Sequence, residues 1–230
     1  MTPPTSVAAR MREQVRLWEE AGDGRSVFLS CYALMTENML RSLEAGRFGD
    51  DDWVDRLLHR FADYYFDALT CYDCGDDPTP EVWRQVHEAS RQRPLHVMQH
   101  LLMGMNAHIT YDLVLTLDEL LRPEWVALDE RGRELRLADH REVNAVIAET
   151  IDVVQDTVVE RYEPLMDLAD RLLGRLDERL LAGLVSRWRE DVWRRAIRLL
   201  GDPEPERREA RVRALERDVL RRGELLLRLG

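Results

Sequence analysis

The 230-residue sequence contains no lysine, so all 33 of its basic side chains are arginines. They are outnumbered by 44 acidic side chains, which leaves a formal net charge of −11 and a sequence pI near 5.1. Binding to a phosphate backbone needs a clustered basic surface, and the arginines here are scattered through helical segments. We therefore expect no nucleic-acid partner, and no attachment to an anionic membrane surface.

Long hydrophobic runs are also missing, because no run reaches the roughly 18 apolar residues that cross a bilayer. The longest candidate, 101–121, is interrupted by polar residues, namely Asn106, His108, Asp112, Asp118 and Glu119. The first residues lack the apolar core of a signal peptide. These absences predict a cytoplasmic protein with no membrane partner, in which 101–121 is a buried helix.

Cysteine is scarce, with only Cys31, Cys71 and Cys74 in the chain. Cys71 and Cys74 have the Cys-x-x-Cys spacing that zinc and redox sites use, yet no second pair or histidines at ligand spacing follow nearby. A thioredoxin-like role would need a βαβ context, which the sequence lacks. Free thiols near a helix end are the simpler interpretation, and the role of the pair stays open.

Hydrophobic residues recur with helical spacing along the whole chain, and no segment alternates for long as a strand does. The pattern predicts an all-α fold, a single-domain multi-helix bundle over 1–230 with a buried polar central helix. A charged C-terminal helix, 204–230, is expected to pack on it. Residues 127–137 are predicted to be a polar connection, followed by a long helix that begins at Asp139. The range 139–180 is predicted to be one kinked helix or two.

The segment PLHVMQHLLMGMNAHITYDLVLTLDELL, residues 94–121, departs from a generic bundle. At about 100° per residue, His100, Gly104, His108 and Asp112 wind slowly along one side of the helix, whereas Asn106 points to the opposite side. The remaining positions are mostly apolar. A helix that is apolar almost all round is buried, so its polar groups need partners inside the protein.

Three interpretations of these polar groups remain open. They could brace neighbouring helices, or they could perform acid–base chemistry, with Asp112 orienting the His108 ring one turn away. In the second case Gly104 leaves room for a ligand or for a crossing helix. In the third, side chains spaced four residues apart, such as His108 and Asp112, supply two ligands of a divalent metal site. Further ligands would then come from other helices, the candidates being Asp63, Asp67, His140, Glu149, Asp152 and Asp156.

The same segment resembles the signature of an uncharacterised bacterial family, a domain of unknown function marked by a QHLLxGxNAHIxxDL helix. The match falls on Gln99, His100, Leu101, Leu102, Gly104, Asn106, Ala107, His108, Ile109, Asp112 and Leu113. Weaker similarity in DGRSVFLSCYALMTE and VNAVIAETIDVVQDTVVERYEPL extends the resemblance over most of the chain. It implies an all-helical single domain, groups His100, Asn106, His108 and Asp112 together, and suggests a setting in bacterial specialised metabolism.

We predict a cofactor-independent enzyme that acts on a small, largely apolar molecule. His108 would be the general acid or base, Asp112 its orienting carboxylate and His100 its partner. Substrate-binding residues would be Asn106, which could instead fix a neighbouring helix, Tyr111, Tyr32 and Asn144. Cyclisation, isomerisation and hydrolysis are all compatible with these residues, and a cyclase or isomerase is favoured because no nucleophile motif, phosphate loop or dinucleotide fingerprint is present. The alternatives are a metal-dependent hydrolase or oxidase using His108 and Asp112, and a non-catalytic binding or structural protein. A homo-oligomer is compatible with each of these functions.

Overall fold

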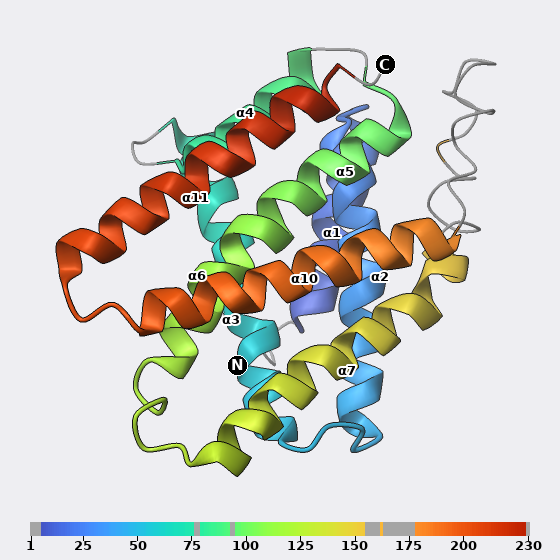
Figure 1. Ribbon diagram of the computed structural model, residues 1–230. Coiled ribbons are helices and arrows are strands. Elements are labelled where there is room, and N and C mark those ends of the chain that lie inside the picture. Colours follow the sequence, from blue (N-terminus) through green and yellow to red (C-terminus); the bar gives the residue numbers. More distant parts are fainter. Residues whose placement is uncertain (1–5, 76–78, 93–94, 155–161, 163–177, 229–230) are drawn as a thin grey trace, which may run out of the picture.

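The computed structural model describes residues 6–75, 79–92, 95–154, 162 and 178–228, and every regular element in these ranges is a helix. This confirms the prediction of an all-α bundle. In chain order the helices are α1 (Val7–Glu20), α2 (Arg25–Glu44), α3 (Asp51–Cys74), α4 (Glu81–Gln92), α5 (Val97–Ala107), η1 (His108–Asp112), α6 (Leu113–Leu121), α7 (Glu130–Val154), α10 (Glu178–Leu200) and α11 (Pro205–Leu226) (Figure 1).

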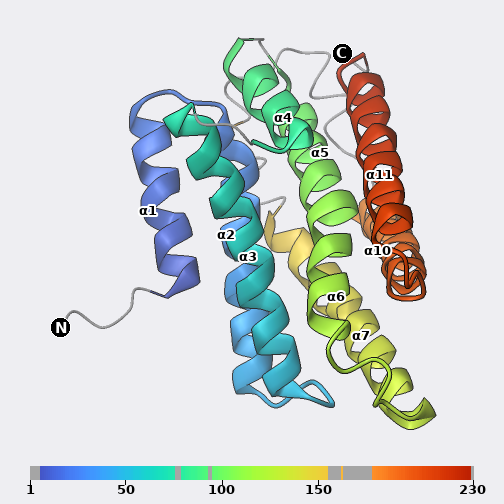
Figure 2. The same ribbon diagram turned by 90° about the vertical axis from the view of Figure 1, so that its left-hand side faces the viewer.

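One continuous rod, α5–η1–α6, runs through the middle of the molecule, and we call it the central helix. Helices α1, α2 and α3 lie together on one side of it, and α10 and α11 lie on the other (Figure 2). The central helix contacts α2, α3, α4, α10 and α11, while α7 bridges α2 and α10. Its burial follows from its composition, because apolar residues occupy all of its sides.

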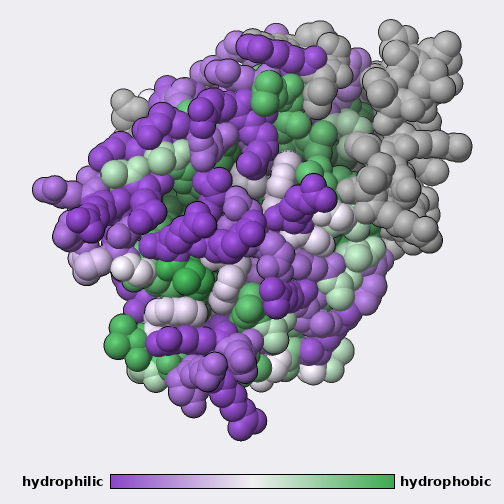
Figure 3. All heavy atoms as spheres, in the orientation of Figure 1, coloured by the Kyte–Doolittle hydropathy of each residue, from purple (hydrophilic) through white to green (hydrophobic). Residues whose placement is uncertain are grey.

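The surface agrees with the charged composition. Seen over α10 and α11, it is largely hydrophilic, with hydrophobic residues showing as separate patches between the helices (Figure 3). In the described part of the chain no helix has the length and apolar character needed to cross a membrane.

Local signals explain several helix ends. Ser6 caps α1 by accepting a hydrogen bond from the Ala9 N–H, and Asp50 caps α3 by accepting one from the Trp53 N–H. Gly75 ends α3 with a φ of 72°, a left-handed conformation that glycine adopts without a steric penalty.

The predicted start of α7 was wrong. The helix begins at Glu130, so most of the expected connection over 127–137 is helical. Asp139 lies inside the helix, where its carboxylate accepts hydrogen bonds from the Gly49 and Asp50 N–H groups. It therefore anchors the loop before α3 instead of capping its own helix. Pro164, the one proline in the range 139–180 and the position where a kink is expected, lies outside the described residues.

The C-terminal helix α11 packs on the central helix and on α4. Two amides of the central helix hold it in place: Gln99 Nε2 donates to the Leu226 carbonyl at 3.3 Å, and Asn106 Nδ2 donates to the Val219 carbonyl at 2.9 Å. Leu215, Val219 and Leu226 add apolar side chains to the main core. This charged helix thus contributes a buried stripe to the bundle.

Gly104 allows α2 to approach the central helix closely. A Cβ atom at this position would lie 2.2 Å from Cγ of Phe28, well inside van der Waals contact. Of the two uses that the sequence left open for Gly104, the crossing helix is the one observed.

We predict that Gly104→Ala destabilises the protein by about 1–3 kcal/mol, because the new methyl group must displace the buried Phe28 ring. Gly183→Ala is the matched control, since Gly183 also lies in a helix but has open space around it. That variant should gain up to about 1 kcal/mol from helix propensity. Urea unfolding of both variants measures the difference. Equal effects at the two sites would contradict the close approach of Phe28.

Candidate functional site

A π-helical turn, η1, interrupts the central helix at His108–Asp112. Its defining bond runs from the Leu113 N–H to the His108 carbonyl, five residues back. Two threonine hydroxyls bond to backbone carbonyls here: Thr110 Oγ1, inside the turn, donates to the Asn106 carbonyl, and Thr116 Oγ1, beyond it, donates to the Asp112 carbonyl. Single π turns are rare and occur frequently at functional sites.

His108, Asp112 and Trp83 form a buried hydrogen-bonded chain. His108 Nδ1 lies 2.9 Å from Asp112 Oδ2, and the Trp83 Nε1–H donates to the same oxygen, also at 2.9 Å. The side chains of His108 and Asp112 are 3% and 2% exposed. An ionised Asp112 requires the proton on Nδ1, which leaves Nε2 as the basic nitrogen.

This burial shifts the pKa values of both His108 and Asp112. It lowers the pKa of His108 well below that of a free histidine, and it raises the pKa of Asp112 well above that of a free aspartate. The hydrogen bond from Trp83 acts in the opposite sense on the Asp112 pKa, because it stabilises the carboxylate. Burial thus favours the uncharged form of each group, and the His108 ring is neutral at neutral pH. The two hydrogen bonds to Asp112 Oδ2, from Trp83 and from His108 Nδ1, favour the carboxylate, and beside a carboxylate the nitrogen that accepts a proton is Nε2.

A cavity of about 140 Å³ lies beside this chain. Five elements contribute to its wall: α2, α3, the central helix, α7 and α10. The lining is mostly apolar and consists of Phe28, Cys31, Tyr32, Met35, Thr36, Met39, Val54, Leu57, Leu58, Phe61, Leu101, Met105, His108, Ile109, Leu113, Val143, Ile147, Ile151, Leu181, Val185 and Arg189. An apolar cavity of roughly 150 Å³ is large enough to bind benzene.

His108 forms part of this wall. Its ring stacks on Phe61, with ring centroids 3.6 Å apart and planes within 6°, and it meets Tyr32 edge-on at 4.4 Å. His108 Nε2 is buried and has no hydrogen-bond partner among the described residues. The ring orientation is thus fixed by Phe61, Tyr32 and Asp112, and Nε2 is the ring nitrogen without a described partner.

The other polar side chains of the wall are mainly neutral. Burial raises the pKa of Tyr32 well above its usual value, and it raises the pKa of Cys31 to about 12. Both groups stay protonated at neutral pH, so Tyr32 is a hydrogen-bond donor and Cys31 is not a thiolate. Arg189 is the one lining residue in the described set that carries a full charge.

The structure does not bring His100 together with His108. His100 lies outside the cavity, with Nδ1 3.3 Å from Ser90 Oγ of α4 and its ring against Gly24. Burial lowers the pKa of His100 to about 4. This histidine links the central helix to its neighbours.

The remaining predicted residues divide between the cavity and the packing around it. Tyr32 lines the cavity, whereas Asn106 faces α11 and Tyr111 is buried outside the cavity. Asn144 is not part of the wall, but its Oδ1 accepts a hydrogen bond from Arg189 Nε at 2.7 Å. Asn144 therefore helps to hold the Arg189 side chain in the cavity wall.

Two residues of the site were missed from the sequence. Trp83 gave no signal, because an indole at a core position on an amphipathic helix is ordinary. Arg189 did leave one: it interrupts the apolar stripe of α10 that Val185, Val192 and Ala196 define. An arginine in such a stripe is buried with it, and a buried charge calls for an explanation.

The residues considered as metal ligands do not converge. Within the described ranges no group of three or more histidine, cysteine, aspartate or glutamate side chains is placed to hold a metal ion. His140 instead contacts the Arg189 carbonyl through Nε2 at 3.0 Å. The Asp152 side chain and Asp156 lie outside the described residues.

Residues 5–229 match the family of unknown function DUF5995. The chain belongs to this family. Comparison with curated proteins and with solved structures gives no significant match. The match covers nearly the whole chain and carries no activity with it.

We predict that Trp83→Phe lowers the free energy of unfolding by about 1.5–3 kcal/mol beyond its packing cost, because the Asp112 carboxylate loses a donor. Trp53→Phe is the matched control: Trp53 is 1% exposed, and its buried Nε1 has no hydrogen-bond partner in the described structure. Urea unfolding of both variants gives the contribution of the hydrogen bond as a difference. If Trp83→Phe costs no more than the control, the bond to Asp112 does not stabilise the fold.

Proposed function

We propose that the protein is a cofactor-independent enzyme that binds a small, largely apolar molecule in the cavity and transfers a proton through His108 Nε2. The observation that carries the proposal is that Nε2 of His108, a buried histidine at the wall of an apolar cavity, has no hydrogen-bond partner among the described residues. A bound molecule supplies the missing partner. A polar atom that is left unpaired in a core costs stability, and a functional role accounts for its retention.

Each residue of the chain has a defined task in this proposal. Asp112 holds the His108 ring through Nδ1 and stabilises the imidazolium that forms when Nε2 takes a proton. Trp83 keeps Asp112 in position. Tyr32 donates a hydrogen bond to a carbonyl or hydroxyl oxygen of the substrate, which stabilises negative charge as the proton leaves carbon.

Isomerisation and cyclisation are the reaction types that fit best. Both require a proton to be removed and returned, and neither needs water, which the apolar lining tends to exclude. The lining offers no activated nucleophile, because Cys31 and Tyr32 stay protonated. A setting in specialised metabolism is compatible with a small apolar substrate.

The test is deuterium exchange into carbon. In D₂O, wild-type protein should speed the exchange of deuterium into the carbon next to the carbonyl of cyclopentanone or cyclohexanone, compared with buffer alone. Proton NMR measures the exchange rate. His108→Phe keeps the stacking on Phe61 but lacks the base, so the rate should fall by about 10²–10⁴-fold. In Asp112→Asn the exchange rate should fall by a smaller factor.

His87→Phe is the control for this experiment. His87 is also buried without a hydrogen-bond partner in the described structure, yet it does not line the cavity. Its substitution should leave the exchange rate unchanged. Exchange by His108→Phe at the wild-type rate would overturn the proposal, and ketone binding without any exchange would indicate a non-catalytic binding protein.

A further inference from the structure

Three arginines are buried in the described part of the chain, and their surroundings differ. Arg25 forms ion pairs with Asp23 and Asp73, and Arg136 forms them with Asp50 and Glu124. Arg189 is 4% exposed, less than either of the other two, and has no carboxylate partner among the described residues.

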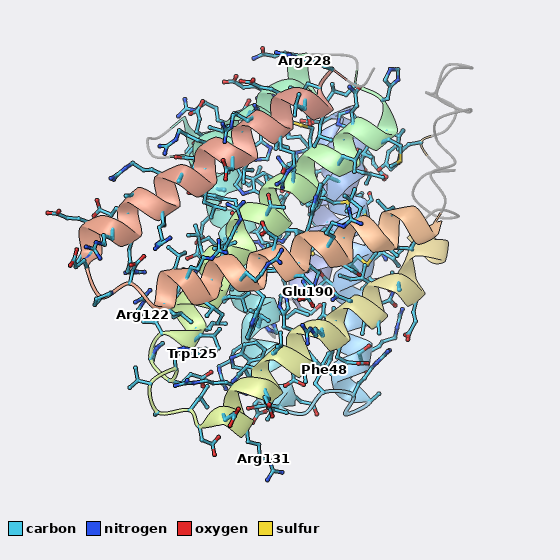
Figure 4. All side chains as sticks on the ribbon, viewed as in Figure 1. Phe48, Arg122, Trp125, Arg131, Glu190 and Arg228 are labelled. Carbon is cyan, nitrogen blue, oxygen red and sulfur yellow. The ribbon has the colours of Figure 1, made fainter. Side chains whose placement is uncertain are left out.

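The described groups that bond to the Arg189 guanidinium are all uncharged. Nε donates to Asn144 Oδ1 at 2.7 Å, and Nη2 donates to the His140 carbonyl at 2.9 Å. Nη1 donates to no described residue. The adjacent acid, Glu190, is directed to α7, where it pairs with Arg141 at 2.7 Å (Figure 4).

A buried charge without a counter-ion is costly, and the usual remedy is a pair of opposite sign. Burial lowers the pKa of Arg189 only to about 10, so the guanidinium remains charged at neutral pH. Arg189 lines the same cavity as His108, on α10, which contacts η1 directly. A counter-ion, which the described residues do not supply, therefore has a place to bind inside the cavity.

We propose that Arg189 binds the carboxylate of a small organic acid whose apolar part fills the cavity. This inference rests on the proposed function, which makes the cavity the substrate site. A planar guanidinium fixed on two sides suits a planar carboxylate, which accepts two parallel hydrogen bonds. The volume limits the apolar part to roughly the size of one six-membered ring.

The test compares benzoate with nitrobenzene, a neutral molecule of the same shape, by isothermal titration calorimetry on the full chain. Wild-type protein should bind benzoate at least about tenfold more tightly, because only benzoate can pair with Arg189. Arg189→Met should abolish this preference while still binding nitrobenzene, and Arg189→Lys should retain part of it. Arg136→Met is the control, since it removes a buried arginine outside the cavity and should keep the preference.

The wild-type comparison decides the inference even if a variant at Arg189 fails to fold. Equal affinities, or a benzoate preference that persists in Arg189→Met, would overturn the role of Arg189. Binding of nitrobenzene but not benzoate would keep the cavity as the ligand site and reject the organic acid. Failure of both molecules to bind would reject the cavity itself, and with it the proposed function.

Discussion

The central helix is enclosed on all sides, and its polar side chains must therefore find partners inside the protein. This constraint positions the helices around it. Gln99 and Asn106 reach carbonyls of α11, while Asp112 accepts from the indole of Trp83 on α4. The two bonds to α11 join elements that are far apart in the sequence, and the bond from Trp83 fixes the preceding helix, α4. A polar helix at the centre thus specifies where its neighbours lie, which a purely apolar helix would leave to packing alone.

The angular positions on the central helix could be worked out from the sequence, because they depend only on about 100° per residue. Asn106 does face away from His108, and Asp112 does meet the His108 ring. The π turn could not be foreseen: one inserted residue hardly alters the pattern of a helix that is apolar on every side. The cavity was equally hidden, since its wall combines α2, α3, α7 and α10 with the central helix.

Asp139 shows why local signals were not enough. An acidic residue after a polar stretch is typical of a helix start, but this carboxylate accepts hydrogen bonds from Gly49 and Asp50, which are distant in the sequence. The charged residues before it still form helix, because one of them, Arg136, is buried between Asp50 and Glu124. Long-range ion pairs therefore extend α7 beyond the boundary that composition indicates.

Unpaired polar atoms do not by themselves mark a functional site, and His87 illustrates the point. Its ring lies between Tyr72 and Trp83, both nitrogens are buried without partners in the described structure, and burial lowers its pKa to about 3. It behaves as an aromatic core residue. His108 differs because a second group holds its ring and because it adjoins open volume. Arg189 adjoins the same volume and has no carboxylate partner among the described residues. In the proposed complex a carboxylate would pair with Arg189, and a hydrogen-bond donor or acidic C–H group of the same molecule would lie next to His108 Nε2.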